Sequence, residues 1–271
     1  MRRIVVMLSI LALLVAIGLA GGYIWIWISG GPGAPSTGIT APPLSDPVPE
    51  AISTGSTSTP PISKVSSPAI SVSVSAPHPS TPTSTTTVVG HLYRITSEES
   101  EVRYIIDEVK RGQPTTVVGT TNQIAGDIRL DLNNPAASQV GVVRINVRTL
   151  RTDEERRDRA TRSRILQSAQ PAFEFSEFSP TTIDGLPASV EVGIPVNLLL
   201  HGDLTIRDIT HPVSFDVTVT LVSLDRLEGK AAATVQRSDY NLVIPSVPFI
   251  ADVSEDVRLE IDLVATLVNE D

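Results

Sequence analysis

Histidines and carboxylates concentrate in one stretch of the chain, HGDLTIRDITHPVSFDVTVTL, from His201 to Leu221. Two histidines and three aspartates fall within its first sixteen residues. Imidazole and carboxylate side chains are common ligands of zinc and common general acids and bases. The stretch therefore raises a metal site or a catalytic cluster as its first hypothesis.

The spacing of the two histidines favours a different interpretation. Side chains alternate between the two faces of an extended strand, and His201 is out of phase with the apolar Leu204. His211, beyond a turn, is in phase with Phe215, so the two imidazoles are expected on opposite faces unless a bulge at Gly202 shifts the register. The chain also has no G-x-S-x-G and no H-E-x-x-H motif. We interpret the stretch as two strands joined by a turn, with no catalytic or metal-binding residue.

An uncharged N-terminal run, residues 4–28, is long enough to cross a bilayer, which takes about 20 apolar residues. Arg2 and Arg3 precede the run, and the next positive residue is Lys64. Positive charge stays on the cytoplasmic side. We therefore expect residues 1–28 to be a single-pass anchor in the cell membrane, with a cytoplasmic N-terminus and an extracytoplasmic remainder.

Two alternatives concern this anchor. A cleaved signal peptide has a shorter apolar core of about 7–15 residues, and the Trp25 and Trp27 ending is typical of an interfacial belt instead. Gly18 and Gly22 form a GxxxG pattern, which leaves a homodimer through the anchor open.

Residues 29–90 are rich in Pro, Ser, Thr and Gly, hold twelve of the 21 prolines, and contain no aromatic residue. Such a segment buries too little apolar surface to offset its ordering entropy. We expect a disordered linker between the anchor and a folded domain at residues 91–271.

The expected domain is acidic, because it holds 18 of the 21 basic and 28 of the 30 acidic residues. This balance argues against nucleic-acid binding, which needs a basic face. The chain has no cysteine, so disulfides, cysteine-ligated zinc and a thiol nucleophile are excluded.

Apolar residues in this domain recur with a period of two, which is typical of half-buried antiparallel strands. The clearest runs and three weaker candidates lie at 128–132, 143–147, 190–196, 213–221, 257–263, 102–106, 173–178 and 231–235. About eight strands with one apolar face each predict an all-β, closed antiparallel barrel or a sandwich.

One segment departs from this period and predicts a helix over 152–169. Thr152 and Glu155 have the spacing of a capping box, and acidic residues fill the first turn. Arginines follow, and Pro171 prevents continuation. The arginine-rich face is interpreted mainly as a solvated surface with internal ion pairs, and contact with anionic lipid is the alternative.

The stretch GDLTIRDITHPVSFDV resembles the G-x-L-T-[IL]-x-G-x-[TS]-[KR]-P-[VL] signature of the YceI-like family of lipid- and polyisoprenoid-binding proteins. Further segments resemble the family in the expected order: 119–132, 143–178, 237–240 and 252–267. The chain departs from the pattern at Asp208, where the family has glycine, at His211, where it has a basic residue, and at 105–108, where it often has a histidine.

The resemblance implies an eight-stranded, lipocalin-like barrel with one helix, and a ligand with a long apolar chain inside it. We expect a binding protein with no catalytic activity, no cofactor and no metal. We expect the in-phase apolar residues to contact the ligand: Tyr104, Phe173, Phe175, Leu204, Ile206, Val213, Phe215 and Val217.

Two other functions stay open. The same alternation describes a barrel filled by its own side chains, which would be a structural or interaction module. An exported hydrolase built from His201, Asp203 and a serine is the third hypothesis.

Overall fold

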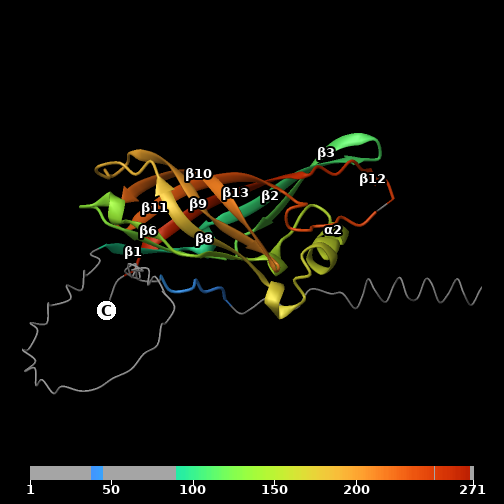
Figure 1. Cartoon of the computed structure of the whole chain (residues 1–271), viewed down its shortest axis with the longest axis horizontal. Coiled ribbons are helices and arrows are strands. Elements are labelled where there is room, and N and C mark those ends of the chain that lie inside the picture. The colour runs from blue at the N-terminus through green and yellow to red at the C-terminus, as the bar shows by residue number, and fades with distance from the viewer. Residues whose placement is uncertain (1–37, 45–89, 247, 269–271) are drawn as a thin grey trace, which may run out of the picture. The chain divides into compact units, whose positions relative to one another are not determined.

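The computed structural model describes residues 38–44, 90–246 and 248–268 (Figure 1). The expected anchor and most of the expected linker lie outside these residues, so the three-part division of the chain stays a prediction. Within the described ranges, no helix is long and apolar enough to cross a bilayer. One piece of the expected linker, residues 38–44, lies against the barrel, where the Thr40 carbonyl accepts a hydrogen bond from Arg144 at 3.3 Å.

The described residues form one antiparallel sheet of thirteen strands. The strands are β1 (His91–Ile95), β2 (Glu101–Lys110), β3 (Gln113–Thr121), β4 (Ile124–Ala125), β5 (Asp127–Leu130), β6 (Gln139–Val140), β7 (Val143–Asn146), β8 (Phe175–Asp184), β9 (Pro195–Ile206), β10 (Ile209–Ser223), β11 (Arg226–Gln236), β12 (Ile250–Ala251) and β13 (Asp256–Leu267).

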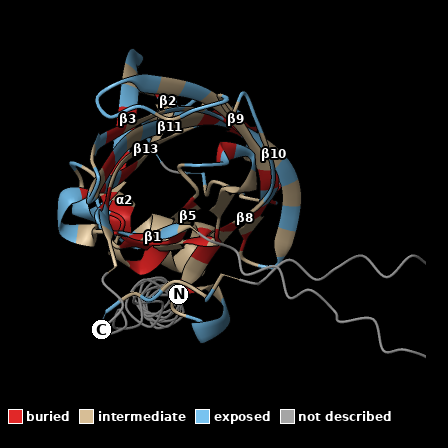
Figure 2. Ribbon diagram, turned by 90° about the vertical axis from the view of Figure 1, so that its left-hand side faces the viewer, coloured by how far each residue is buried: buried red, intermediate tan, exposed pale blue. Residues whose placement is uncertain are grey.

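The order of the strands closes the sheet into a barrel. The main path runs β4-β7-β8-β9-β10-β11-β13-β1-β5-β6, and β2 joins β13 to β3. Strands β4 and β5 are successive parts of one stretch interrupted by Gly126, so the two ends of the path meet. Figure 2 views the strands end-on, arranged as a ring.

The prediction of eight strands is wrong in number, although the all-β class and the lipocalin-like barrel are confirmed. Several strands are short pieces of longer runs: β4, β5, β6 and β12 span four residues or fewer. The break between β4 and β5 falls at Gly126, where a Cβ would lie 2.9 Å from Ile95 Cδ1. A local pattern cannot show where such a break divides one run into two strands.

The expected strand at 190–196 is also wrong. Pro195 begins β9, and the residues before it form a loop with a turn in which Ile194 N donates to the Glu191 carbonyl at 3.3 Å. Gly193 has a φ of 81°, which breaks the extended backbone. Val192 is exposed in this loop, so the alternation of apolar and polar residues here does not correspond to a buried face of a strand.

The expected helix is present but shorter. It comprises α2 (Glu155–Ala160) followed by a π-helical turn, η4 (Thr161–Ile165). The capping interaction differs from the prediction, because Asp158 and not Glu155 reaches back to Thr152 N, at 2.7 Å. Within the helix, Arg159 forms an ion pair with Glu155 four residues earlier, at 3.5 Å. Short 3₁₀ turns complete the connections: η1 (Ser97–Glu99), η2 (Pro135–Ala137), η3 (Val147–Thr149) and η5 (Pro171–Phe173).

The two ends of the barrel differ. At the end we call the helix end, α2 lies near the β2–β3 and β9–β10 turns and the loop residues 237–246 and 248–249 (Figure 1). Hydrogen bonds join these parts: Arg207 to the Ile165 carbonyl at 3.0 Å and Arg111 N to the Phe249 carbonyl at 2.7 Å. The far end carries the loop 185–194 and the β10–β11 turn at 224–225.

The conformation of the β9–β10 turn shows why aspartate is compatible with position 208, where the YceI-like signature has glycine. The left-handed backbone falls on the preceding residue, Arg207, with a φ of 59°. Asp208 is not among the residues with positive φ, so its position does not require glycine.

Candidate functional site

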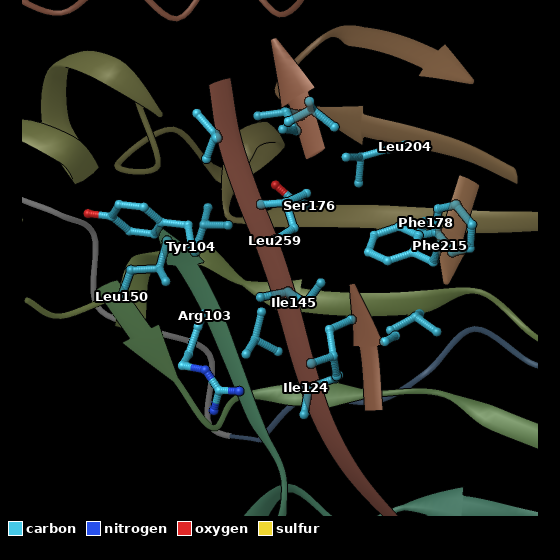
Figure 3. Close-up of a pocket in the computed structure, with 18 of the residues that line it drawn as sticks. Arg103, Tyr104, Ile124, Ile145, Leu150, Ser176, Phe178, Leu204, Phe215 and Leu259 are labelled. Atoms are coloured by element: carbon cyan, nitrogen blue, oxygen red, sulfur yellow. The ribbon is translucent and has the colours of Figure 1, made fainter. Parts of the chain in front are cut away.

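The barrel interior contains a cavity of about 770 Å³. Its wall is made mainly by aliphatic and aromatic side chains that point inward from successive strands (Figure 3). Every second residue of β10 from Phe215 to Leu221 contributes to this wall. Ligand pockets of roughly 300–1,000 Å³ accommodate drug-sized molecules, so the cavity has the size of a binding site.

Strand pairing sets which residues reach the cavity. Tyr104 of β2 lies opposite Leu259 of β13 in the antiparallel register, and both line the cavity. On the other wall the rings of Phe178 and Phe215 meet edge to face, with their centroids 4.9 Å apart. Figure 3 shows Tyr104 and this aromatic pair at opposite sides of the space.

Five of the eight residues expected to contact a ligand line this cavity: Tyr104, Leu204, Ile206, Phe215 and Val217. Three are not part of the lining: Phe173, Phe175 and Val213. Whether the five touch a ligand stays a prediction.

The course of the chain at the start of β8 accounts for two of the three. The run F-E-F-S-E-F places Phe175 and Phe178 three residues apart, so they cannot share a face of one strand. The structure turns Ser176 and Phe178 inward, while the Arg144 guanidinium lies 5.1 Å from the centroid of the Phe175 ring. Phe173 precedes the strand, in η5. The sequence prediction did not include Phe178 among the lining residues. Phe178 shares its strand face with the polar Ser176, so no alternation of apolar residues pointed to it.

The lining becomes charged at the helix end. The charged residues that border the cavity there are Glu108, Lys110, Arg111, Glu154, Arg156, Arg157, Arg164 and Arg237. Toward the far end the lining is mainly apolar, with Leu186, Val190 and Leu221 among its members, and Arg103 of β2 is a further charged residue of the lining outside the rim set. The cavity is thus amphipathic along its length.

Ion pairs organise this charged rim. The Glu108 carboxylate is buried and lies 3.2 Å from Arg157 Nη2, and Lys110 Nζ lies 2.7 Å from Glu154. The Lys110 ammonium, as a hydrogen-bond donor, holds the pKa of Glu154 below its usual range. Burial raises the pKa of the Tyr104 hydroxyl, which therefore stays neutral at the edge of the rim. Glu108 belongs to the segment 105–108, one of the places where the chain departs from the family pattern, and its partner Arg157 is 49 residues away in the sequence.

A buried ion pair fixes the segment after the helix to the wall. Arg148 Nη1 lies 2.8 Å from Glu174 Oε2, and both side chains are buried. Asn146 Nδ2 donates to the other Glu174 oxygen at 3.2 Å, and Arg148 Nε donates to the Ser168 carbonyl. These bonds hold the chain on both sides of the helix against β7.

Replacing Arg148 with leucine should lower the free energy of unfolding by about 3 kcal/mol, because Glu174 loses its arginine while it stays buried. Urea denaturation measures this loss. The matched control is Arg144→Leu, which removes a half-exposed partner of Glu177 and should cost below about 1 kcal/mol. Equal losses in the two variants would contradict the special role of the buried pair.

The two histidines lie on opposite faces, as the alternation predicted. His201 points outward and its ring nitrogens contact Ser214 Oγ at 2.6 Å and Asp184 Oδ2 at 3.1 Å. The His211 ring instead packs on the ring of buried Tyr240, at a centroid distance of 5.3 Å. Among the described residues, no group of three or more His, Cys, Asp or Glu side chains is placed to hold a metal ion.

The His201 contacts have the composition of a Ser-His-Asp triad, but they lie across three neighbouring strands on the outer wall. The carboxylate in contact is Asp184, in place of the expected Asp203. The Asp184 side chain is exposed, and none of the three residues borders the cavity. Backbone N–H groups in paired strands are engaged in the ladder, so they offer no oxyanion site.

A comparison with protein families matches residues 93–265 to the YceI-like domain. The chain belongs to the YceI-like family. The match covers more than half of the chain and all the strands from β2 to β12. No curated relative matches the sequence.

Solved structures share the YceI-like fold at low identity. A polyisoprenoid-binding domain from Saccharophagus degradans, implicated in plant cell wall breakdown, is 12% identical, with a TM-score of 0.53. It covers 65% of this chain and 98% of its own. BcnA from Burkholderia cenocepacia is 16% identical, with a TM-score of 0.50, and covers 64% of this chain and 99% of its own. In both cases the match covers nearly the whole of the solved chain and about two thirds of this one.

Proposed function

We propose that the barrel binds one lipid or polyisoprenoid molecule, with the apolar chain of the ligand inside the cavity. The observation that carries this proposal is the cavity of about 770 Å³, whose wall is mainly apolar. Each methylene moved from water into such a wall contributes about 0.8 kcal/mol. A long hydrocarbon chain is therefore the ligand class that gains most from this site.

Two further observations support this ligand class. The chain belongs to the YceI-like family, and the similar domain from Saccharophagus degradans is a polyisoprenoid-binding domain. The amphipathic lining also matches an amphiphile, whose polar end would lie at the charged rim.

The proposal includes a location. Residues 1–28 anchor the chain in the cell membrane with the N-terminus in the cytoplasm, and residues 29–90 tether the barrel on the extracytoplasmic side. Tethering raises the effective concentration of the barrel near a membrane source of lipid. The support is the uncharged run 4–28 with Arg2 and Arg3 before it.

The proposed protein is a carrier or a store and not an enzyme. The open interior favours this reading over a filled structural module, since inward side chains leave the cavity between them. The position of His201 on the outer wall, away from the cavity, disfavours a hydrolase.

Native mass spectrometry of residues 90–271, followed by organic extraction, tests the proposed function. All the buried residues of the hydrophobic core fall between Tyr93 and Ala265, so this fragment is expected to fold alone. We expect a stoichiometric apolar adduct that extraction removes. A bare mass that stays unchanged after incubation with long-chain isoprenoids and with membrane lipids would favour the filled module.

A further inference from the structure

The helix end exposes apolar side chains next to the charged rim of the cavity. Val243 is 73% exposed and Phe249 is 75% exposed, and both belong to the loop that follows β11. Phe249 also borders the cavity. Exposed apolar residues rimmed by polar groups mark an interaction site when they form a contiguous patch, whereas single exposed apolar residues are common on protein surfaces.

The backbone holds the Phe249 ring in this exposed position. Its φ of 72° lies in the left-handed region, which a bulky side chain rarely adopts. The Arg111 N–H donates to the Phe249 carbonyl at 2.7 Å, and the Arg111 guanidinium lies 6.0 Å from the centroid of the ring. The strained backbone therefore presents an aromatic ring and a cation together.

Two cations at this rim lack a carboxylate partner. Arg111 and Arg156 both border the cavity and are exposed, and neither forms an ion pair within the described ranges. The other rim cations differ, since Lys110 and Arg157 are neutralised by Glu154 and Glu108. These two arginines can bind an external anion without first breaking an ion pair with a carboxylate of the described residues.

The far end differs in charge, although it also exposes apolar side chains. Leu224 is 64% exposed there. It is followed by Asp225, and one arginine, Arg226, lies between Glu99 and Glu228 at 2.7 and 2.8 Å. At the far end the arginine is thus held by two carboxylates. The helix end combines exposed apolar groups with two arginines outside any ion pair of the described residues, and exposed carboxylates also lie at this end: Asp153, Glu155 and Asp208.

From this combination we propose that the helix end docks on an anionic lipid bilayer, with Val243 and Phe249 entering the interface and Arg111 and Arg156 contacting lipid phosphates. Aromatic residues favour the interface, and each arginine near an anionic surface adds about 1 kcal/mol of attraction. Docking here places the mouth of the cavity against the bilayer, so an apolar ligand would cross without meeting water. This transfer of a ligand between the bilayer and the cavity rests on the proposed function, whereas the docking itself does not depend on it.

Flotation of residues 90–271 with vesicles of phosphatidylcholine and phosphatidylglycerol tests the docking. We expect binding to these vesicles, little binding to pure phosphatidylcholine, and weakening as salt rises. The double variant Val243→Asp with Phe249→Asp should lose binding at least about tenfold, and Arg111→Gln or Arg156→Gln should each lose about fivefold.

The matched control is Leu224→Asp, which places the same charge on an exposed apolar residue at the far end and should change binding less than about twofold. Circular dichroism melting verifies that each variant is folded. Equal binding of the wild type to both kinds of vesicle, or an equal loss in Leu224→Asp, would overturn the proposal. Flotation measures docking whether or not the barrel holds a ligand. Failure to bind vesicles would therefore overturn the docking proposal alone, and native mass spectrometry would still test ligand binding.

Discussion

Phe215→Asp is expected to abolish the folded barrel, or at least its ability to retain a ligand. Phe215 is 4% exposed, packs against Phe178, and forms part of the cavity wall. Removing a buried phenylalanine ring costs about 3–5 kcal/mol, and a buried carboxylate without a partner adds to that cost. This sum is comparable to the whole stability of an ordinary domain. Circular dichroism melting and native mass spectrometry measure the two outcomes.

A control and a milder variant keep this prediction informative. Val222→Asp introduces the same charge on the same strand at a residue that is 41% exposed, and it should change stability by about 0.5 kcal/mol or less. Phe215→Leu should stay folded with a looser wall and reduced ligand retention. Unchanged melting and unchanged ligand content in Phe215→Asp would remove Phe215 from the barrel interior.

Ala231→Trp is expected to eliminate most ligand binding while the barrel stays folded. Ala231 of β11 borders the cavity, where an indole ring can occupy space that the ligand needs. If the ring displaces two or three methylenes of an apolar chain, affinity falls roughly 30-fold at about 0.8 kcal/mol per methylene. Retention of a long-chain isoprenoid, measured by native mass spectrometry, reports the change.

The next residue supplies a matched control. Ala232 is the same residue type on the same strand, but its side chain is not part of the cavity wall. Ala232→Trp should therefore leave ligand binding within about twofold of the wild type. In a filled barrel Ala231→Trp would instead overpack the core and lower stability by about 1–3 kcal/mol. Equal ligand retention in both variants would contradict a ligand in this cavity.

Local patterns in the sequence determined much of the wall. A period of two predicted the inward positions of β10 and placed His201 and His211 on opposite faces. This works because strand geometry forces neighbouring side chains to opposite faces. The all-β class follows from the same rule applied to many segments.

The pattern failed where two phases or two conformations fit equally well. The run from Phe173 to Phe178 has phenylalanine in both phases, and packing against Phe215 selects Phe178. Val192 and Ile194 alternate with other residues in the same way, but they lie in a loop. Their side chains are exposed, and these two residues belong to no strand of the described sheet. Apolar periodicity alone carries no information on which partner covers a face.

Tertiary structure alone decided whether the barrel is open and how its mouth is built. The open space depends on how the strands tilt and close around it, which no single strand encodes. The rim joins Glu108 to Arg157 and brings Arg111 beside Phe249, although these residues are far apart in the sequence. The sequence therefore determined the apolar wall through local alternation, whereas the hollow interior and its charged mouth arise only from long-range closure of the sheet.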